Sequence, residues 1–311
     1  MTQDTATQDT ATQDSATQDS ASRYRSVFAP DLFADQLAVV TGGGSGIGRC
    51  IAHELASLGA RVVITGRKVE KLDRVAAEIT EDGGTVATAA FDIRDEEAVE
   101  REVSAIVEAH GPITHLVNNA GGQFPAPAEV INKKGFETVV RTNLTGGFLM
   151  AKTCYLKAMH KSGGSVVNII ADMWNGMPGM AHSGAARAGM LNLTRTLAYE
   201  WAARGVRVNA VAPGWVASSG LDTYEGPAKA MIGQLAGAVP LRRLATEAEV
   251  SAAVCFLLSP AAAFITGECV KVDGAASLAS HVWPIPDHDR APTFQGFHRA
   301  VTPKVLQGGE G

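Results

Sequence analysis

The sequence predicts an α/β fold with a single doubly wound, seven-stranded parallel sheet and helices on both faces. Three observations predict it: short continuous apolar runs, long helical patterns between most of them, and a glycine cluster after the first run. Continuous apolar strands are typical of a parallel sheet that is covered on both faces. The chain has 311 residues and is 46% hydrophobic, which suffices for one large core.

The expected elements follow one another in a regular order. The apolar run 36–40 precedes the glycine cluster 42–48, and helical stretches are expected at 49–58 and 69–79. The expected strands are 36–40, 61–65, 85–91, 113–118, 165–170, 206–212 and 269–272. Crossovers between parallel strands are right-handed, and ligands bind at the carboxyl ends of the strands in such a Rossmann-type sheet. We therefore expect the functional site at this edge.

The two ends of the chain differ in composition from the part between them. Residues 2–21 repeat a five-residue unit four times, TQDTA twice and then TQDSA twice, without a large apolar residue. Such a segment cannot bury a core, so we expect residues 1–22 to form a disordered low-complexity tail. We expect the Rossmann-fold domain at 23–280 and a C-terminal extension at 281–311.

Composition argues against several classes of function. The formal net charge is −5 and no Lys/Arg-rich run occurs, so we expect no nucleic-acid partner. No apolar stretch approaches the roughly 20 residues of a membrane helix, so we expect no membrane partner. The N-terminus lacks a signal-peptide pattern, and a cytoplasmic protein is expected. Cys50, Cys154, Cys255 and Cys269 lie far apart without metal-ligand spacing, which predicts buried free thiols and no metal site.

The first turn carries the pattern of a nucleotide site. Residues 41–48 read Thr-Gly-Gly-Gly-Ser-Gly-Ile-Gly, between the first strand and the first helix. Glycines let a pyrophosphate approach closely, and the helix N-terminus offers free N–H groups. After the second strand, Gly66 is followed by Arg67 and Lys68, with no carboxylate for the ribose hydroxyls. These cations favour NADP(H) over NAD, because a 2′-phosphate would find its partner there. The alternative is that Arg67 is a solvated residue at a helix start.

Further segments resemble the short-chain dehydrogenase/reductase superfamily. Residues 41–48 resemble its Thr-Gly-x-x-x-Gly-x-Gly pattern, 118–121 its Asn-Asn-Ala-Gly, and Asn143 the asparagine of a family helix. The resemblance runs from about Gln36 to Leu278 and includes the turn Pro213-Gly214 beside the nicotinamide. With the two cations included, the expected cofactor-binding residues are Thr41, Gly42, Ser45, Gly46, Ile47, Gly48, Arg67, Lys68, Asp92, Ile93, Asn119, Ala120, Gly121, Arg187, Pro213, Gly214, Val216 and Ser218.

One departure from the family pattern bears on the reaction. The family carries a Tyr-x-x-x-Lys pair, a spacing that places both side chains on one helix face. Here Ser183 stands in the tyrosine position and Arg187 in the lysine position, while Ala171 stands where the family has a serine. Only Asn143 of that catalytic set remains.

That departure is itself a resemblance to one branch of the family. The peroxisomal trans-2-enoyl-CoA reductases reduce carbon–carbon double bonds of acyl-CoA thioesters without the usual pair. They resemble this chain at 117–124, 182–189 and 254–267, and the 2,4-dienoyl-CoA reductases are more distant relatives. The resemblance implies NADP(H)-dependent reduction of the 2,3 double bond of a trans-2-enoyl-CoA. It also implies a homotetramer, with the helices 142–159 and 183–204 at its interface.

The missing tyrosine suits such a reduction. Hydride goes to the β-carbon, and negative charge develops on the thioester oxygen, which needs hydrogen-bond donors rather than a tuned acid. Ser183 and Asn143 are the expected donors, and Arg187 is expected to hold the nicotinamide ribose. Tyr224 lies in segment 215–238, where lids over bound substrate are typical, and is a candidate to touch the substrate.

Alternatives remain for several of these residues. Ser183 is as readily interpreted as a small residue that lets its helix pack closely. The alternative for Arg187 is a surface charge, and the alternative for His182 is a structural histidine. Asp172 is expected either to line the pocket beside Met173 or to be a helix-cap or solvated carboxylate.

Two other functions also remain open. One is a short-chain alcohol or carbonyl oxidoreductase acting on a terpenoid alcohol or a 3-oxoacyl thioester, against which the absence of Tyr-x-x-x-Lys counts. The other is a catalytically inactive NADP(H)-binding sensor or scaffold, which the three altered catalytic positions favour and the intact glycine turn disfavours.

Overall fold

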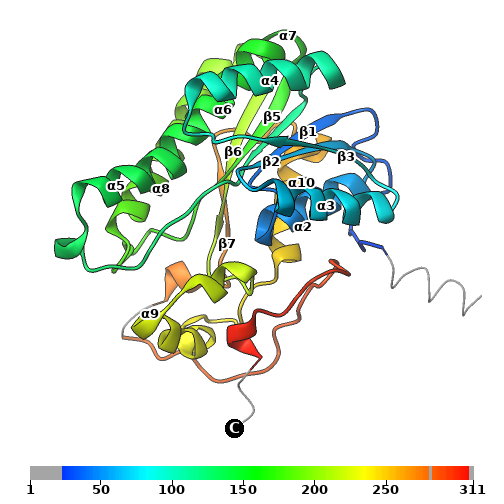
Figure 1. The fold of residues 1–311 in the computed structure, drawn as a ribbon. Helices are drawn as coiled ribbons and strands as arrows, with labels where there is room; N and C mark the ends of the chain where they lie inside the picture. Colours follow the sequence, from blue (N-terminus) through cyan, green and yellow to red (C-terminus); the bar gives the residue numbers. More distant parts are fainter. Residues whose placement is uncertain (1–22, 280–281, 308–311) are drawn as a thin grey trace, which may run out of the picture.

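The computed structural model describes residues 23–279 and 282–307, so the expected tail at 1–22 lies outside the described residues. Seven parallel strands form one sheet in the order β3-β2-β1-β4-β5-β6-β7 (Figure 1). The strands are β1 Leu37–Thr41, β2 Arg61–Gly66, β3 Thr85–Ala90, β4 His115–Asn118, β5 Gly164–Ile169, β6 Val206–Pro213 and β7 Cys269–Val272. The predicted fold class is confirmed.

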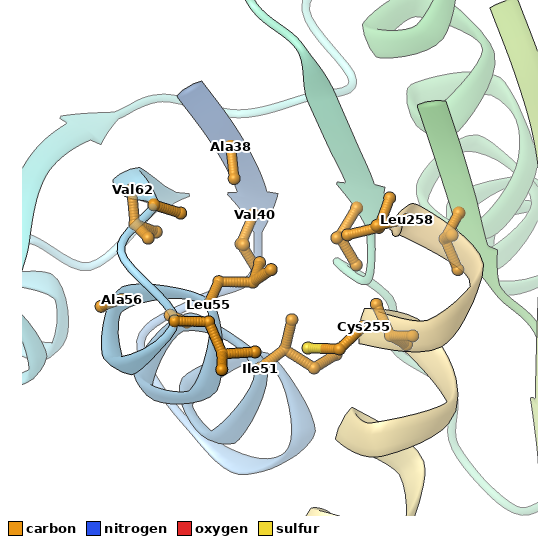
Figure 2. Packing of buried hydrophobic residues seen from close by; sticks show 14 of the residues in the cluster. Ala38, Val40, Ile51, Leu55, Ala56, Val62, Cys255 and Leu258 are labelled. Atoms are coloured by element: carbon orange, nitrogen blue, oxygen red, sulfur yellow. The ribbon is translucent and has the colours of Figure 1, made fainter. Parts of the chain in front are cut away.

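Helices cover both faces of this sheet. The helices of the described residues are α2 Gly46–Ser57, α3 Val69–Glu81, α4 Glu96–His110, α5 Lys133–Val140, α6 Gly146–Cys154, α7 His160–Ser162, α8 Ala181–Trp201, α9 Gly226–Met231 and α10 Glu247–Leu258, of which α9 lies away from the sheet (Figure 1). Alternate residues of β1 face the two layers, which explains why its whole apolar run is buried. Ala38 and Val40 belong to the core that α2, α3 and α10 share, and Figure 2 shows the side chains of α2 and α10 in it. Leu37 and Val39 belong to the core under α4, α6 and α8.

Several ends of the expected elements shift by one to three residues, and three differences from the expectations need an explanation. The first helix begins at Gly46 rather than at residue 49, because the glycine cluster already contributes its first turn. The helix expected at 142–159 contains the π-helical turns Arg141–Thr145 and Tyr155–Met159 on either side of α6, which apolar periodicity does not reveal. The prediction of a buried thiol is wrong for Cys269, which is only half-buried on the edge strand β7.

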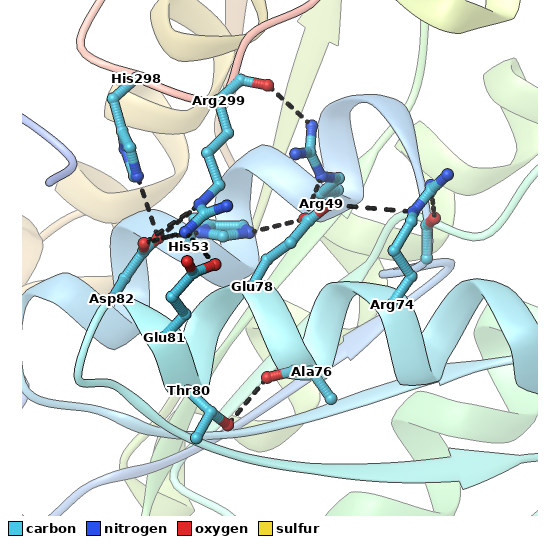
Figure 3. Close-up of polar contacts among 11 residues, drawn as sticks. Arg49, His53, Arg74, Ala76, Glu78, Thr80, Glu81, Asp82, His298 and Arg299 are labelled. Atoms are coloured by element: carbon cyan, nitrogen blue, oxygen red, sulfur yellow. Dashed lines mark hydrogen bonds and ion pairs between the residues drawn. The ribbon is translucent and has the colours of Figure 1, made fainter. Parts of the chain in front are cut away.

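The C-terminal extension packs back onto the domain. Its Phe297 is 1% exposed and stacks on Tyr24 with ring centroids 5.7 Å apart. Arg299, two residues further on, donates a hydrogen bond from Nη2 to Oδ1 of the Asp82 carboxylate at the end of α3, at a distance of 2.6 Å (Figure 3). His298 points at the same carboxylate, with Nε2–Oδ2 3.1 Å. Burial alone would raise the pKa of Asp82, but Arg299 and His298 hold it below its ordinary value.

Removing the Phe297 ring is expected to destabilise the whole fold. Phe297→Ala should lower the free energy of unfolding by roughly 3–5 kcal/mol, as buried phenylalanines generally do. Val301→Ala is the matched control, because Val301 lies in the same extension and is 71% exposed. Chemical denaturation measures both variants. Equal, small losses in the two would show that the extension contributes little to the stability of the domain.

Candidate functional site

A cavity of about 620 Å³ lies at the carboxyl ends of the strands. Its lining comes from the segments that follow β1, β2, β3, β4, β5 and β6, where the fold predicts a ligand. Seventeen residues expected at the site line it: Gly42, Ser45, Gly46, Ile47, Arg67, Lys68, Asp92, Ile93, Asn119, Ala120, Gly121, Arg187, Pro213, Gly214, Val216, Ser218 and Tyr224. Thr41, Gly48, Asn143 and Ser183 were expected at the site and lie behind this lining.

Thr41 and Gly48 hold the glycine-rich loop against the end of β4. The Thr41 hydroxyl accepts hydrogen bonds from the backbone N–H groups of Asn119 at 3.0 Å and Ala120 at 2.9 Å. A Cβ at Gly48 would lie 2.4 Å from the side-chain amide nitrogen Nδ2 of Asn119 and 2.4 Å from the backbone carbonyl oxygen of Gly42. Because real Cβ atoms essentially never come that close, glycine is required here so that α2 can start directly under the loop.

The loop and α2 fit a bound pyrophosphate. Gly42 has φ +68° and Gly46 φ +58°, values that L side chains rarely adopt. Ser45, which precedes α2, makes no side-chain capping bond, and the first turn of α2 contains no acidic residue. The first turn of α2 therefore brings no carboxylate of its own to these N–H groups, although the Glu247 carboxylate of α10 lies 3.8 Å from where a Cβ on Gly46 would stand. The site thus fits the phosphate groups of a nucleotide cofactor.

The end of the cavity beside β2 and β3 is rich in cations. Arg67 and Lys68 line it as expected, and Lys71 of α3 lines it as well. Asp92 also lines it, and its carboxylate forms an ion pair with Arg94, with Nη2–Oδ2 2.5 Å. The hydrogen bond from Arg94 lowers the pKa of Asp92, so the carboxylate stays charged. The sequence analysis did not include Lys71 and Arg94 among the site residues. The position of Lys71 on the helix after Lys68 could have indicated the first, and the spacing Asp92-Ile93-Arg94 could have indicated the second.

Asn143 lies in the π-helical turn between α5 and α6 and is buried. Its amide nitrogen donates to the Gly122 carbonyl oxygen at 2.9 Å, and its amide oxygen accepts from the Gly122 N–H at 2.9 Å. Both ends of the side chain are therefore occupied by backbone. Asn143 thus holds the loop after β4, and its side chain lies behind the cavity lining.

Arg187 on α8 is buried and faces the cavity, so the alternative that it is a surface charge is wrong. Its Nη1 donates to the Ile169 carbonyl oxygen at 2.6 Å, while its Nε has no hydrogen-bond partner. A Cβ at Gly121 would lie 2.5 Å from Nη2, so the guanidinium rests directly on this glycine. Burial lowers the pKa of Arg187 to about 10, which leaves it charged at neutral pH. A cation that lines the cavity and is anchored to a backbone carbonyl fits the hydroxyls of a ribose.

Ser183 is fully buried, and its hydroxyl donates to the amide oxygen of Gln123 at 2.8 Å. The amide nitrogen of Gln123 in turn donates to the Tyr224 hydroxyl oxygen at 3.2 Å. Gln123 and Tyr224 line the cavity, so both side chains can meet a ligand bound there. Sequence reasoning missed Gln123, which the segment 117–124 contained but which no family motif marked.

The other residues near this cluster have structural surroundings. His182 is buried, with the Phe124 ring edge-on at a centroid distance of 4.5 Å. Ala171 lines the cavity, whereas Asp172 and Met173, expected there as one alternative, are not among its lining residues. Burial is the main reason that the pKa of Asp172 is raised.

The segment after β6 covers one side of the cavity. Leu221, Ile232 and Leu235 form a small apolar cluster with Tyr224 at its edge. Val305 and Leu306 of the C-terminal extension pack on the same cluster, and the Val305 N–H donates to the Asp222 carboxylate at 3.0 Å. Figure 1 shows the red end of the extension beside α9. The extension thus braces the segment that carries Tyr224.

Within residues 23–279 and 282–307, no group of three or more His, Cys, Asp or Glu side chains is placed to hold a metal ion. None of the helices in the same ranges is long and apolar enough to span a membrane.

Comparisons with known proteins agree with this geometry. Residues 42–276 match the family model described as enoyl-(acyl carrier protein) reductase. A peroxisomal 2,4-dienoyl-CoA reductase of Danio rerio is 37% identical over 263 residues, which are 83% of this chain and 87% of that protein.

Two solved structures are also similar. The citronellol catabolism dehydrogenase AtuB of Pseudomonas aeruginosa is 58% identical with a TM-score of 0.74, covering 82% of this chain and 100% of that one. An actinorhodin polyketide ketoreductase variant solved with NADPH is 30% identical with a TM-score of 0.73, covering 80% and 99%.

Proposed function

Because the chain belongs to the short-chain dehydrogenase/reductase superfamily, we propose that it reduces the 2,3 double bond of a trans-2-enoyl-CoA thioester with NADPH. One observation carries this proposal: α8 presents Ser183 and Arg187 where the family has Tyr and Lys. The serine is buried behind Gln123, and no tyrosine of α8 lines the cavity, so α8 lacks the phenol that protonates an alkoxide in the family. Gln123 and Tyr224 line the cavity and carry hydrogen-bond donors that an enolate oxygen could use.

The residues of this chain have distinct tasks in such a reaction. The glycine-rich loop, Arg67 and Lys68 bind the phosphates of the cofactor, and Arg187 holds the nicotinamide ribose. NADPH supplies the hydride that the β-carbon receives. The electron pair of the double bond moves to the thioester oxygen, where hydrogen-bond donors stabilise the charge. Tyr224 is the donor that the cavity offers, and the α-carbon then takes a proton from Tyr224 or from water.

NADPH is expected to bind at least tenfold more tightly than NADH, a difference of roughly 1.4 kcal/mol. The reason is that Arg67 and Lys68 line the cavity where the second strand ends, with Lys71 beside them. Arg67→Asp should erase or invert the preference, whereas Arg101→Asp, on α4 and with an exposed side chain, should leave it unchanged. Calorimetry on both cofactors measures this, and equal affinities in the wild type would contradict the assignment.

A substrate panel that follows NADPH absorbance tests the proposed reaction. We expect turnover with trans-2-enoyl-CoA, and little with 3-oxoacyl-CoA or aldehydes, because the family protonates the alkoxide with the tyrosine of its Tyr-x-x-x-Lys pair, which α8 lacks. A 2,4-dienoyl-CoA belongs in the panel, since it carries the same conjugated thioester. Faster reduction of ketones than of enoyl thioesters at matched concentrations would refute the proposal. Cofactor binding without turnover of any substrate would instead favour an inactive NADP(H) sensor.

A terpenoid alcohol oxidoreductase is the second candidate. It is supported by the 58% identity to the protein named citronellol catabolism dehydrogenase. The panel therefore includes citronellol with NADP⁺ in the direction of oxidation. Oxidation of citronellol faster than reduction of every enoyl thioester would replace the first candidate by the second.

A homotetramer and a cytoplasmic location remain proposals. The exposed Phe148 of α6 and the surface groove that it shares with α8 support an assembly through these helices. Light scattering on the purified protein determines the number of subunits.

A further inference from the structure

Gln123 connects two side chains that come from distant parts of the chain. It lies in the segment that follows β4, and its exposed side chain lines the cavity. On one side, its amide oxygen accepts from the hydroxyl of Ser183, 60 residues away on α8. On the other, its amide nitrogen donates to the hydroxyl of Tyr224, 101 residues away in the segment after β6.

The backbone on both sides of Gln123 is held in place. Gly122 exchanges two hydrogen bonds of 2.9 Å with the buried amide of Asn143. Phe124 places its ring edge against the buried imidazole of His182. Further along, the Ala126 N–H donates to the Gly179 carbonyl oxygen at 2.8 Å. Because these contacts fix the backbone at Gln123, the direction of its Cα–Cβ bond is fixed as well. Only the side-chain torsions then determine where its amide group lies.

The direction of the two hydrogen bonds has a chemical consequence. An amide accepts only at its oxygen and donates only at its nitrogen. Because the Ser183 hydroxyl donates to the oxygen of Gln123, the nitrogen is left to face Tyr224. A phenol has a single proton, and here its oxygen already accepts from Gln123. The proton of Tyr224 is therefore free for a group bound in the cavity.

We infer that Gln123 is a positioning residue that transmits the orientation of the buried Ser183 hydroxyl to Tyr224. In this arrangement Tyr224 serves as donor to the substrate oxygen. The identity of that oxygen, a thioester carbonyl, rests on the proposed function; the coupling of the three side chains does not. Ser183 acts through Gln123 and has no substrate contact of its own.

An isosteric substitution separates positioning from packing. In Gln123→Glu the carboxylate accepts from both neighbours and captures the phenolic proton of Tyr224. Turnover should fall by about 10²–10³-fold, the range for loss of one such donor. It should fall as far in Tyr224→Phe. The activity of Gln123→Glu should recover as the pH falls, because a protonated carboxyl again has a proton to donate to Tyr224. A flat pH profile, or unchanged activity, would contradict the inference.

A second readout needs no substrate. With 3-fluorotyrosine in all four tyrosine positions, the resonance missing in Tyr224→Phe is that of Tyr224. Ser183→Ala should move this resonance although the two side chains share no contact, and it should have no such effect in a Gln123→Ala background. Gln234→Ala, in the same covering segment and exposed, is the control that should leave it in place.

The two readouts distinguish the coupling from the reaction. If the chemical shift of the Tyr224 resonance is the same in Ser183→Ala as in the wild type, the inference is overturned, whichever substrate the enzyme reduces. A resonance that follows Ser183 through Gln123, in a protein that does not reduce enoyl thioesters, would support the coupling and refute only the proposed function.

Discussion

Replacing Arg187 by methionine is expected to lower kcat/KM for an enoyl thioester by about 10²-fold or more, the scale for losing one preorganised electrostatic contact. The guanidinium is buried on Gly121, bonded to the Ile169 carbonyl oxygen, and keeps an unpartnered Nε. Methionine fills a similar volume but has no hydrogen-bond donor. The nicotinamide ribose would therefore lose its partner, and the Ile169 carbonyl oxygen would lose its hydrogen bond. The loss should appear in cofactor affinity as well as in turnover.

Two control variants give this result its meaning. Arg187→Lys restores a cation of the kind that the family carries, and it should recover most of the lost activity. Arg195→Met, on the same helix with an exposed side chain, should behave as wild type. Full activity of Arg187→Met would show that the buried cation has only a packing function.

Enlarging Gly48 is expected to abolish tight cofactor binding. Gly48→Val would place its Cβ 2.4 Å from two atoms, the Asn119 amide nitrogen and the Gly42 carbonyl oxygen. The loop must then move away from β4 and lose the Thr41 bonds that hold it. Misplaced phosphate-binding groups should raise the Kd for NADPH by about 10²-fold or more, since such a shift removes several charge-assisted contacts.

The experiment is fluorescence titration of NADPH alongside circular dichroism. The spectrum of Gly48→Val should stay that of an α/β protein, because the clash is confined to the loop. Gly233→Ala, where an added Cβ meets nothing within 4 Å, is the matched control. Wild-type affinity in Gly48→Val would mean that the glycine-rich loop does not bind the cofactor.

The sheet and the glycine loop were predictable because their signals are local. Strand β1, the turn after it and α2 are contiguous in the sequence, and the spacing of glycines reflects the conformation that each requires. The same holds for Arg67 and Lys68, whose place after β2 follows from the alternation of strands and helices. These residues line the cavity where we expected them.

The substrate side was predictable only in part, because its contacts join distant residues. Ser183 was expected to face the substrate, but its hydroxyl is occupied by Gln123, 60 residues earlier. The brace on the covering segment depends on Val305 meeting Asp222, 83 residues earlier. Neither pairing leaves a periodic or motif-like trace. Asn143 was predicted from its motif, but only the three-dimensional arrangement shows that both ends of its amide hold Gly122.

The most direct test of the proposed reaction is the position of isotope in the product. With NADPH deuterated at C4 and a trans-2-enoyl-CoA in ordinary water, mass spectrometry and NMR should find one deuterium, at C3 of a saturated acyl-CoA. In deuterated water with unlabelled NADPH, the label should appear at C2 instead. Deuterium on C1, with the double bond intact and CoA released as the free thiol, would contradict the account, because the hydride would then have gone to the thioester carbonyl carbon.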